Sequence, residues 1–271
     1  MNKFLKFIAL GTAASLMALS FAACSGGETA SSNPGGSSDG AYDGPTLDLV
    51  TDGTLTMGTN AYFPPFEYYE GGEIVGVDAA LMQAIAEKLG LELEIVDMEF
   101  DSLSEALTGG SIDVIAAGFT RDPKREEQMD FTNDYFTAKQ TILVRSDSGY
   151  TSKEDLEDKK IGGQTSTTGL STCAMELTAE ENIIGYGNGS LAVEALLGGE
   201  VDAVIIDNNP AQEYYTQHSD ELTLIEDQFA EEQYAMGVKK GNTDLLNAIN
   251  DALDELKADG TFDEIIAEYI K

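Results

Sequence analysis

Two hydrophobic periods alternate along most of the chain. From about residue 47 onward, short apolar or alternating runs are separated by stretches whose apolar residues recur at helical spacing. In "VDAALMQAIAEKLG", Leu81, Ile85 and Leu89 share one face of a predicted helix, and Gly90 marks its end. The runs "TLTMGTN", "LELEIV" and "IDVIAAG" predict strands around this helix. Strands that alternate with helices in this way predict an α/β fold.

Capping residues predict two further helix starts. In "SLSEALTGG", Ser102 and Glu105 have capping-box spacing, so a helix is predicted to begin at Ser102 and to stop at the glycine pair. In "RDPKR", Asp122 is the predicted cap and Pro123 lies in the first turn. Both places mark a boundary between a loop and a helix.

One decapeptide occurs twice in similar form. The segment "ALTGGSIDVI" (residues 106–115) is echoed by "ALLGGEVDAV" (residues 195–204). Each predicts a helix end, a Gly-Gly turn and a strand, which suggests two lobes of similar build, although this joint is common in α/β proteins and can recur by coincidence. At the same offset, Gly118 corresponds to Asp207. Because open α/β sheets bind ligands beyond the carboxyl ends of their strands, both residues are predicted to face one cleft.

The charge of the chain makes one basic cluster conspicuous. The sequence has 49 acidic and 15 basic residues and a net charge of −34, which repels polyanions and argues against nucleic acid as a partner. Against this background, "GFTRDPKR" (residues 118–125) brings together Arg121, Lys124 and Arg125. The cluster is either a solvated charged run or a site for an anion. Facing Asp207, an anion site would suit a zwitterion.

The first residues have the pattern of an export signal. A basic start with Lys3 and Lys6 is followed by an apolar run and by small residues before Cys24. Residues 1–23 are therefore predicted to be a signal peptide. An uncleaved membrane anchor is the alternative, because the apolar run is 17 residues long. Residues 24–46 are rich in serine and glycine and are predicted to form a flexible tether.

Several segments between residues 47 and 271 form a set: "GTNAYFPPFEY", "GEIVGVDAALMQAIAEKLG", "GGSIDVIAAGFTRDPKREEQMDFTNDYF", "GGEVDAVIIDNNPA" and "YAMGVKKGNTDLLNAINDALDELKADGTFDEII". In this order and spacing, the set resembles the amino-acid-binding proteins of ABC importers, the family 3 extracellular solute-binding proteins. The resemblance implies a two-lobe periplasmic-binding-protein-like fold (type II) with two hinge strands between the lobes. Lobe 1 would comprise residues 47–141 plus 234–271, and lobe 2 residues 142–233.

A second resemblance concerns the predicted cleavage site. The tetrapeptide Phe21-Ala22-Ala23-Cys24 resembles the bacterial lipobox, with Phe21 where leucine is usual. This resemblance implies that Cys24 becomes the acylated first residue of the mature protein and anchors it to the membrane.

The family resemblance implies a site for the α-carboxylate of an amino acid. Arg125 would clamp this carboxylate through its planar fork. Thr120 would add a hydroxyl group. Thr167 and Thr168, in "GQTSTTG", would meet the carboxylate at a helix start.

The rest of the ligand would be held by other residues. Asp207 would take the α-ammonium, helped by the carbonyl group of Gly118. Phe63 and Phe100 match the positions of aromatic residues that sandwich the ligand side chain. Asn60 stands where members selective for cationic ligands often have an acid, which argues against a strongly basic preference.

Other polar residues are expected to be solvated. Arg121 and Lys124 match variable, solvent-facing positions of the family. The acidic stretches at residues 154–160 and 226–233 are interpreted as solvated faces.

Cysteine and histidine are too few for a cysteine metal site or a disulfide framework. If Cys24 is lipidated, Cys173 is the remaining cysteine and is expected to pack as a small apolar residue. His218 is the one histidine and is expected to be solvated near a helix end. No metal and no cofactor is predicted.

The two resemblances together imply a monomeric, lipid-anchored receptor on the extracytoplasmic face of the cell membrane. It would capture a free amino acid and deliver it to an ABC transporter permease with its ATPase, without enzyme activity. The ligand would bridge the two lobes and stabilise their closed form. One alternative is an enzyme on the same fold, of the dehydratase or cell-wall lytic type, with Glu67 as a candidate carboxylate. Another is a ligand sensor.

Overall fold

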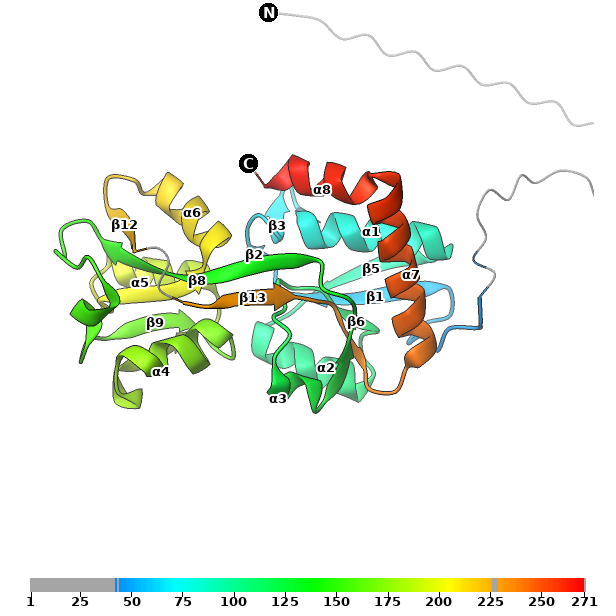
Figure 1. The fold of residues 1–271 in the computed structure, drawn as a ribbon, viewed down its shortest axis with the longest axis horizontal. Helices are drawn as coiled ribbons and strands as arrows, with labels where there is room; N and C mark the ends of the chain where they lie inside the picture. Colours follow the sequence, from blue (N-terminus) through cyan, green and yellow to red (C-terminus); the bar gives the residue numbers. More distant parts are fainter. Residues whose placement is uncertain (1–41, 43, 226–228, 271) are drawn as a thin grey trace, which may run out of the picture. The chain divides into compact units, whose positions relative to one another are not determined.

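The structure, a computed structural model, describes residues 42, 44–225 and 229–270. Three β-sheets organise these residues (Figure 1). The first sheet contains, in spatial order, β5 (Glu92–Asp97), β1 (Thr54–Thr59), β6 (Val114–Ile115), β14 (Gly237–Lys239) and β7 (Met129–Phe131). The second contains β10 (Ile183–Tyr186), β9 (Ile161–Gln164), β11 (Ala203–Asp207), β8 (Phe136–Arg145) and β12 (Leu222–Ile225), and β13 (Glu231–Tyr234) also pairs with β8. The third is the small sheet of β2 (Tyr62–Phe63), β3 (Glu67–Glu70) and β4 (Glu73–Val75).

Helices cover the faces of the two larger sheets. The α-helices are α1 (Val77–Leu89), α2 (Leu103–Gly109), α3 (Pro123–Glu126), α4 (Ala174–Leu177), α5 (Gly189–Leu197), α6 (Asn208–Gln217), α7 (Thr243–Asp259) and α8 (Thr261–Tyr269). Short 3-10 turns occur at Phe100–Ser102, Lys153–Leu156 and Glu180–Asn182, and a π-helical turn at Gly169–Cys173 leads into α4. The predicted α/β fold is confirmed.

The first sheet is packed on both faces. On one face, Met57 of β1 lies in an apolar cluster with Leu81 of α1 and Leu253 of α7. Its neighbour Gly58 faces the other side, where Leu103 of α2 packs. Because both faces are covered, polar groups that serve a ligand must stand at the ends of the strands and in the loops that follow them.

The second sheet is packed in the same way. Val204 and Ile205 of β11 point to two different apolar clusters. Cys173 belongs to the second cluster, as predicted for a small apolar residue, and burial raises the pKa of its thiol to about 12. β11 pairs antiparallel with β8 in a register that sets Asp207 opposite Gln140. Asp207 is thus the last residue of a buried strand.

Two strands carry the chain between the first and second sheets. β8 follows β7 of the first sheet, and β13 precedes β14 of the same sheet. The two strands run antiparallel beside each other, with Phe136 opposite Tyr234 and Lys139 opposite Glu231 (Figure 1). They correspond to the implied hinge strands. The lobe boundaries at 141/142 and 233/234 remain a prediction, and both fall within these strands.

The structure confirms the predicted side-chain cap at one of the two helix starts and not at the other. Ser102 directly precedes α2 and Gly110 ends it, as predicted, but the capping-box hydrogen bonds are absent. Ser102 closes a 3-10 turn that runs directly into α2, and its hydroxyl donates to Asp101 at 3.3 Å. Asp122 is confirmed as a cap, since its carboxylate accepts from the backbone N–H of Lys124 at 2.8 Å. Gly90 ends α1 in the left-handed conformation, as predicted.

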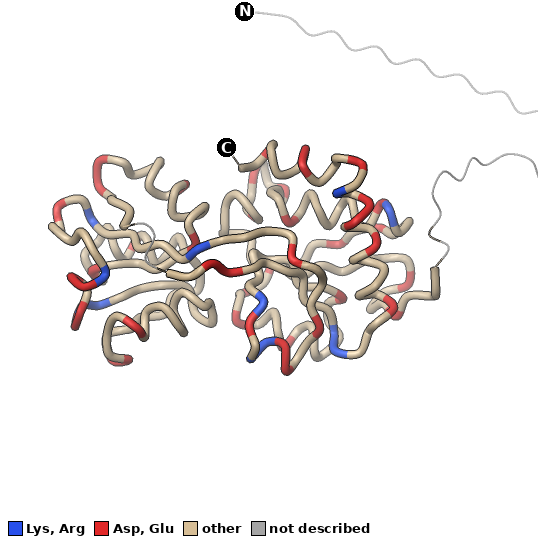
Figure 2. Tube along the Cα trace, viewed as in Figure 1, with Lys and Arg blue, Asp and Glu red and all other residues tan. Residues whose placement is uncertain are grey.

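Acidic residues are spread along most elements of the described chain, with few Lys and Arg residues between them (Figure 2). Among the helices of the described residues, none is long and apolar enough to cross a membrane. The predicted signal peptide (residues 1–23), most of the predicted tether, and Cys24 lie outside the described residues.

Candidate functional site

Arg125 is held in place by the backbone and by aromatic rings. Its Nη1 donates to the carbonyl oxygen of Thr120 at 2.8 Å, and its Nη2 donates to that of Ser166 at 3.0 Å. The guanidinium carbon lies 3.9 Å from the ring centroid of Phe119 and 5.5 Å from that of Phe100. Burial lowers the pKa of Arg125 to about 10, so the side chain stays charged at neutral pH.

This arrangement leaves donors for an anion. A guanidinium carries five N–H groups, and the two hydrogen bonds to Thr120 and Ser166 use two of them. Within the described part of the chain, the other N–H groups of Arg125 form no further hydrogen bond or ion pair. A planar, oriented fork of this kind suits a carboxylate.

The segment before Arg125 is docked on β13. Thr120 is buried and forms an isolated bridge with Tyr234. The backbone N–H of Arg121 donates to the carbonyl of Gln233 at 2.8 Å, and that of Ala235 donates to the carbonyl of Phe119 at 3.1 Å. The connecting strand β13 therefore positions the predicted ligand-binding loop.

Gly118 begins this loop in a conformation that favours glycine. Its φ is +51°, and a Cβ added there would lie 2.6 Å from the ring of Phe63. Its N–H donates to the Asp78 carboxylate at 2.7 Å, and the Tyr135 hydroxyl donates to the other oxygen of Asp78 at 2.8 Å. Phe63 thus packs directly against Gly118 at the predicted site. The Asp78 carboxylate holds the loop through the N–H of Gly118.

A substitution at Gly118 tests this packing. Gly118→Ala is expected to lower the free energy of unfolding by about 2–5 kcal/mol, because a left-handed alanine and a clash with Phe63 add up. Gly90→Ala is the matched control, since φ is +67° there and nothing lies within 4 Å of the added Cβ. It is expected to cost only about 1–2 kcal/mol in urea unfolding. Equal losses for the two variants would contradict the close approach of Phe63.

Asp207 is a buried carboxylate at the end of β11. The Tyr234 hydroxyl donates to its Oδ1 at 2.6 Å, and its side chain forms no hydrogen bond to the start of α6. The side chain of Asp207 therefore does not cap α6. Burial, and then the nearby Glu232, raise the pKa of Asp207 to about 7. In the described part of the chain no Lys or Arg forms an ion pair with Asp207, so a cationic group would stabilise its charge.

The two predicted threonines differ in their contacts. The Thr167 hydroxyl donates to the carbonyl of Gln164 at 2.7 Å and accepts from the N–H of Leu170 at 3.3 Å, so it caps the turn locally. The Thr168 hydroxyl donates to Glu232 Oε2 at 2.7 Å. Its backbone N–H, at the start of the turn Gly169–Cys173, remains the group of Thr168 that could donate to a ligand carboxylate.

Asn60 links the two larger sheets. Its Nδ2 donates to the carbonyl of Met98 at 2.8 Å, and its Oδ1 accepts from Gln164 Nε2 at 2.8 Å. The side chains of Phe63 and Phe100 belong to different apolar clusters, and each residue is 9% exposed. Their predicted contact with a ligand side chain remains a prediction.

Glu232 is a further residue at the site and is not among the predicted ligand-binding residues. It was interpreted as part of a solvated acidic stretch, and that interpretation is wrong. Glu232 is half-buried, and its Oε2 accepts from Thr120 Oγ1 at 2.8 Å and from Thr168 Oγ1 at 2.7 Å. One signal was available: Glu232 is two residues before Tyr234 on a strand, so both side chains share a face.

Arg121 is less exposed than predicted. Arg121 is half-buried and forms an ion pair with Asp134 at 3.0 Å and a longer one with Glu126 at 3.9 Å. Its guanidinium also donates to the carbonyl of Thr132. Lys124 is exposed, as predicted. The basic cluster therefore separates into Arg125, which has unused donors, and Arg121, which is paired.

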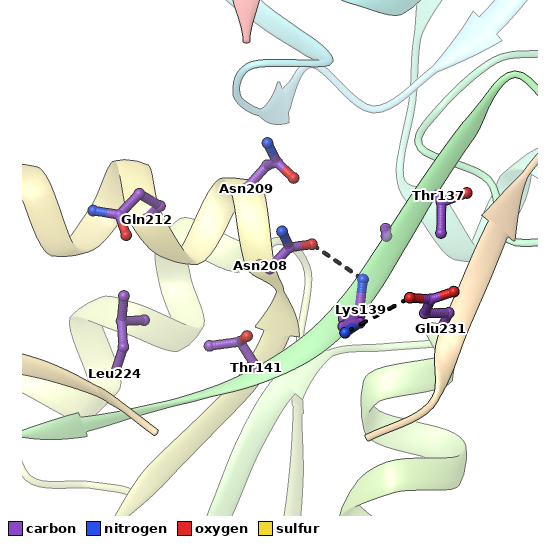
Figure 3. A pocket seen from close by; sticks show the side chains of 9 residues that line it. Thr137, Lys139, Thr141, Asn208, Asn209, Gln212, Leu224 and Glu231 are labelled. Atoms are coloured by element: carbon purple, nitrogen blue, oxygen red, sulfur yellow. Dashed lines mark hydrogen bonds and ion pairs between the residues drawn. The ribbon is translucent and has the colours of Figure 1, made fainter. Parts of the chain in front are cut away.

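A cavity of about 420 Å³ lies elsewhere (Figure 3). It is lined by Thr137, Ala138, Lys139, Thr141, Asn208, Asn209, Gln212, Leu224 and Glu231. Lys139 and Thr141 flank Gln140 on β8, whose side chain contacts Thr168 at 3.4 Å. Because side chains alternate along a strand, this cavity lies on the other side of β8 from the predicted site. Among the described residues, no group of three or more His, Cys, Asp or Glu residues could hold a metal ion.

Comparison with known proteins defines the class. Residues 55–271 match the model of the bacterial extracellular solute-binding proteins, family 3, and the chain belongs to this family. The "Arginine-binding extracellular protein ArtP" of Bacillus subtilis (strain 168) is 34% identical over 214 residues, which are 78% of this chain and 84% of the relative.

Solved structures agree with this membership. "An ancestral arginine-binding protein bound to arginine" is 40% identical with a TM-score of 0.76, and the match covers 81% of this chain and 99% of that one. "The ancestral amino acid-binding protein AncCDT-1, a precursor of cyclohexadienyl dehydratase" is 32% identical with a TM-score of 0.73, covering 81% and 96%.

Proposed function

We propose that this chain is an extracytoplasmic receptor that binds a free amino acid and delivers it to the permease of an ABC transporter. The observation that carries the proposal is a pair of opposite charges joined through Tyr234. Its hydroxyl bonds Asp207 at 2.6 Å, and its backbone bridges Thr120, whose carbonyl holds Arg125 at 2.8 Å. A carboxylate that lacks a cation and a guanidinium with unused donors complement the two charges of an α-amino acid.

The proposal includes the finer features that the sequence implies. Arg125 takes the α-carboxylate, Asp207 takes the α-ammonium, and ligand bridges the two lobes. The receptor acts as a monomer, is held at the extracytoplasmic face of the membrane by lipid on Cys24, and works with a permease and its ATPase.

A calorimetric panel tests the proposal directly. The purified full chain is titrated with each of the twenty proteinogenic L-amino acids at pH 8, where Asp207 is largely ionised because its pKa is about 7. At least one amino acid is expected to bind with 1:1 stoichiometry. If none of the twenty produces heat of binding, the assignment to amino acids is wrong.

The enzyme alternative has one link among the solved structures, an ancestral amino acid-binding protein named as a precursor of a dehydratase, but the residues of this chain favour binding. Glu67, the candidate carboxylate, is 1% exposed and lies beside Asp78, and burial raises its pKa well above the usual value. A carboxyl group enclosed in this way is not available to a substrate. We therefore propose a receptor without enzyme activity.

A further inference from the structure

Glu232 connects three side chains around the candidate site. Its Oε2 accepts from Thr120 Oγ1 at 2.8 Å, from Thr168 Oγ1 at 2.7 Å and from Gln140 Nε2 at 3.5 Å. These partners come from the loop after β6, the turn after β9, and β8, while Glu232 itself stands on β13. One carboxylate oxygen thus gathers groups from both larger sheets.

Each of the two threonine hydroxyl groups, of Thr120 and of Thr168, has a single proton to donate. A hydroxyl group carries one proton and two lone pairs, whereas an ionised carboxylate only accepts. Thr120 and Thr168 therefore each donate their single hydroxyl proton to Glu232. Toward any third partner their oxygens can act only as acceptors. Thr168 also accepts from Gln140 Nε2 at 3.4 Å, which fixes its orientation further.

The charges near the Thr120 and Thr168 oxygens also favour a cationic donor as their partner. Glu232 and Asp207 are close enough that the charge of Glu232 contributes to the raised pKa of Asp207. The side of the site near Asp207 is thus rich in acceptors and negative charge, and donors are supplied by Arg125. A group with several N–H donors and a positive charge fits the acceptor-rich side, and a hydroxyl group, with one proton and no charge, fits it poorly.

We propose that Glu232 is a positioning residue that turns the hydroxyl groups of Thr120 and Thr168 into acceptors for the ligand's α-ammonium, and so makes the site select amino acids over the corresponding 2-hydroxy acids. This inference rests on the proposed function. It adds a specificity-determining residue on a connecting strand.

Glu232→Gln tests the inference with little change in shape. A glutamine amide can donate to a threonine hydroxyl, which frees the hydroxyl proton to turn toward the ligand. The probes are the tightest binder among the twenty L-amino acids and its 2-hydroxy analogue, titrated into the full chain. The variant is expected to bind the amino acid about tenfold more weakly and the 2-hydroxy acid within about threefold of the unsubstituted protein.

Glu231→Gln is the matched control. Glu231 is the adjacent, exposed residue of β13 and pairs with Lys139 at 3.7 Å, so this variant changes the net charge equally on the other face of the strand. It is expected to leave both affinities unchanged. Retained binding of the 2-hydroxy acid by Glu232→Gln also shows that this variant is folded.

Three results would overturn the inference. An unchanged amino-acid affinity would show that Glu232 does not act on the ligand. Equal losses for the amino acid and the 2-hydroxy acid would reveal a merely structural role. Tighter amino-acid binding would show that Glu232 only occupies the place of the ligand carboxylate. If the unsubstituted protein binds none of the twenty amino acids, the proposed function itself fails, and that outcome is separate from these three.

Discussion

Arg125→Ala is expected to abolish measurable amino-acid binding, with a loss of affinity of at least about 30-fold. The side chain supplies the oriented, charged donors of the site, and its removal leaves the ligand carboxylate without a cation. The loop itself should persist, because Thr120 remains bridged to Tyr234 and Asp122 still caps α3. Titration calorimetry with the amino acid found in the panel measures the loss.

Arg121→Ala is the matched control for this prediction. It removes the same charge four residues earlier, but Arg121 is engaged by Asp134 at 3.0 Å and by Glu126 at 3.9 Å. Partly exposed ion pairs contribute about 0–1 kcal/mol, so only a small loss of stability is expected, with affinity retained within about threefold. Comparable losses of affinity in the two variants would contradict the assignment of the carboxylate to Arg125.

The sequence predicted those parts of the protein that depend on local pattern. Helical spacing and a glycine stop located α1, and the repeated decapeptide marked the joints that lead into β6 and β11. Asp207 was recognised because it corresponds to Gly118 at the offset of the repeated decapeptide, and it does end β11. Arg125 was recognised mainly through the family resemblance, since its charge alone does not distinguish it from Arg121.

Contacts between distant segments could not be predicted in the same way. Glu232 and Thr120 are 112 positions apart, and the spacing between Glu232 and Tyr234 does not indicate that the Glu232 carboxylate meets a hydroxyl group from the loop after β6. Arg121 has the same difficulty, because its partner Asp134 comes from the segment that follows β7. At Ser102 a local rule failed, since the preceding turn continues into α2 and removes the need for a cap.

The affinity for an amino acid is expected to depend on pH through Asp207. Burial and the charge of Glu232 raise the pKa of this carboxyl group to about 7 in the ligand-free protein, whereas an α-ammonium beside it favours the ionised form. Ligand must therefore displace a proton below pH 7. Affinity should therefore fall by about 30-fold between pH 8, where Asp207 is largely ionised, and pH 5.5.

The raised pKa of Asp207 has the opposite effect on the stability of the ligand-free protein, which falls as the pH rises. A carboxyl group whose pKa rises from 3.8 to about 7 on folding contributes stability that is complete below pH 3.8 and is lost as the pH rises through 7. The ligand-free protein should therefore lose part of its stability across this window, and bound amino acid should restore it toward pH 8. Thermal unfolding with and without ligand at several pH values measures both trends.

Two variants separate Asp207 from other titrating groups such as Asp78, whose pKa burial raises to about 6. Asp207→Asn cannot ionise and is expected to bind more weakly at every pH with a nearly flat profile. Tyr234→Phe removes the hydroxyl that donates to Asp207 at 2.6 Å and helps to lower its pKa, so the profile should move to higher pH. A flat profile for the unsubstituted protein, or an unmoved one for Tyr234→Phe, would show that Asp207 is not the group that meets the ammonium. A shift of the Tyr234→Phe profile to higher pH would show that the charge of Asp207, at the end of β11, interacts with the ligand.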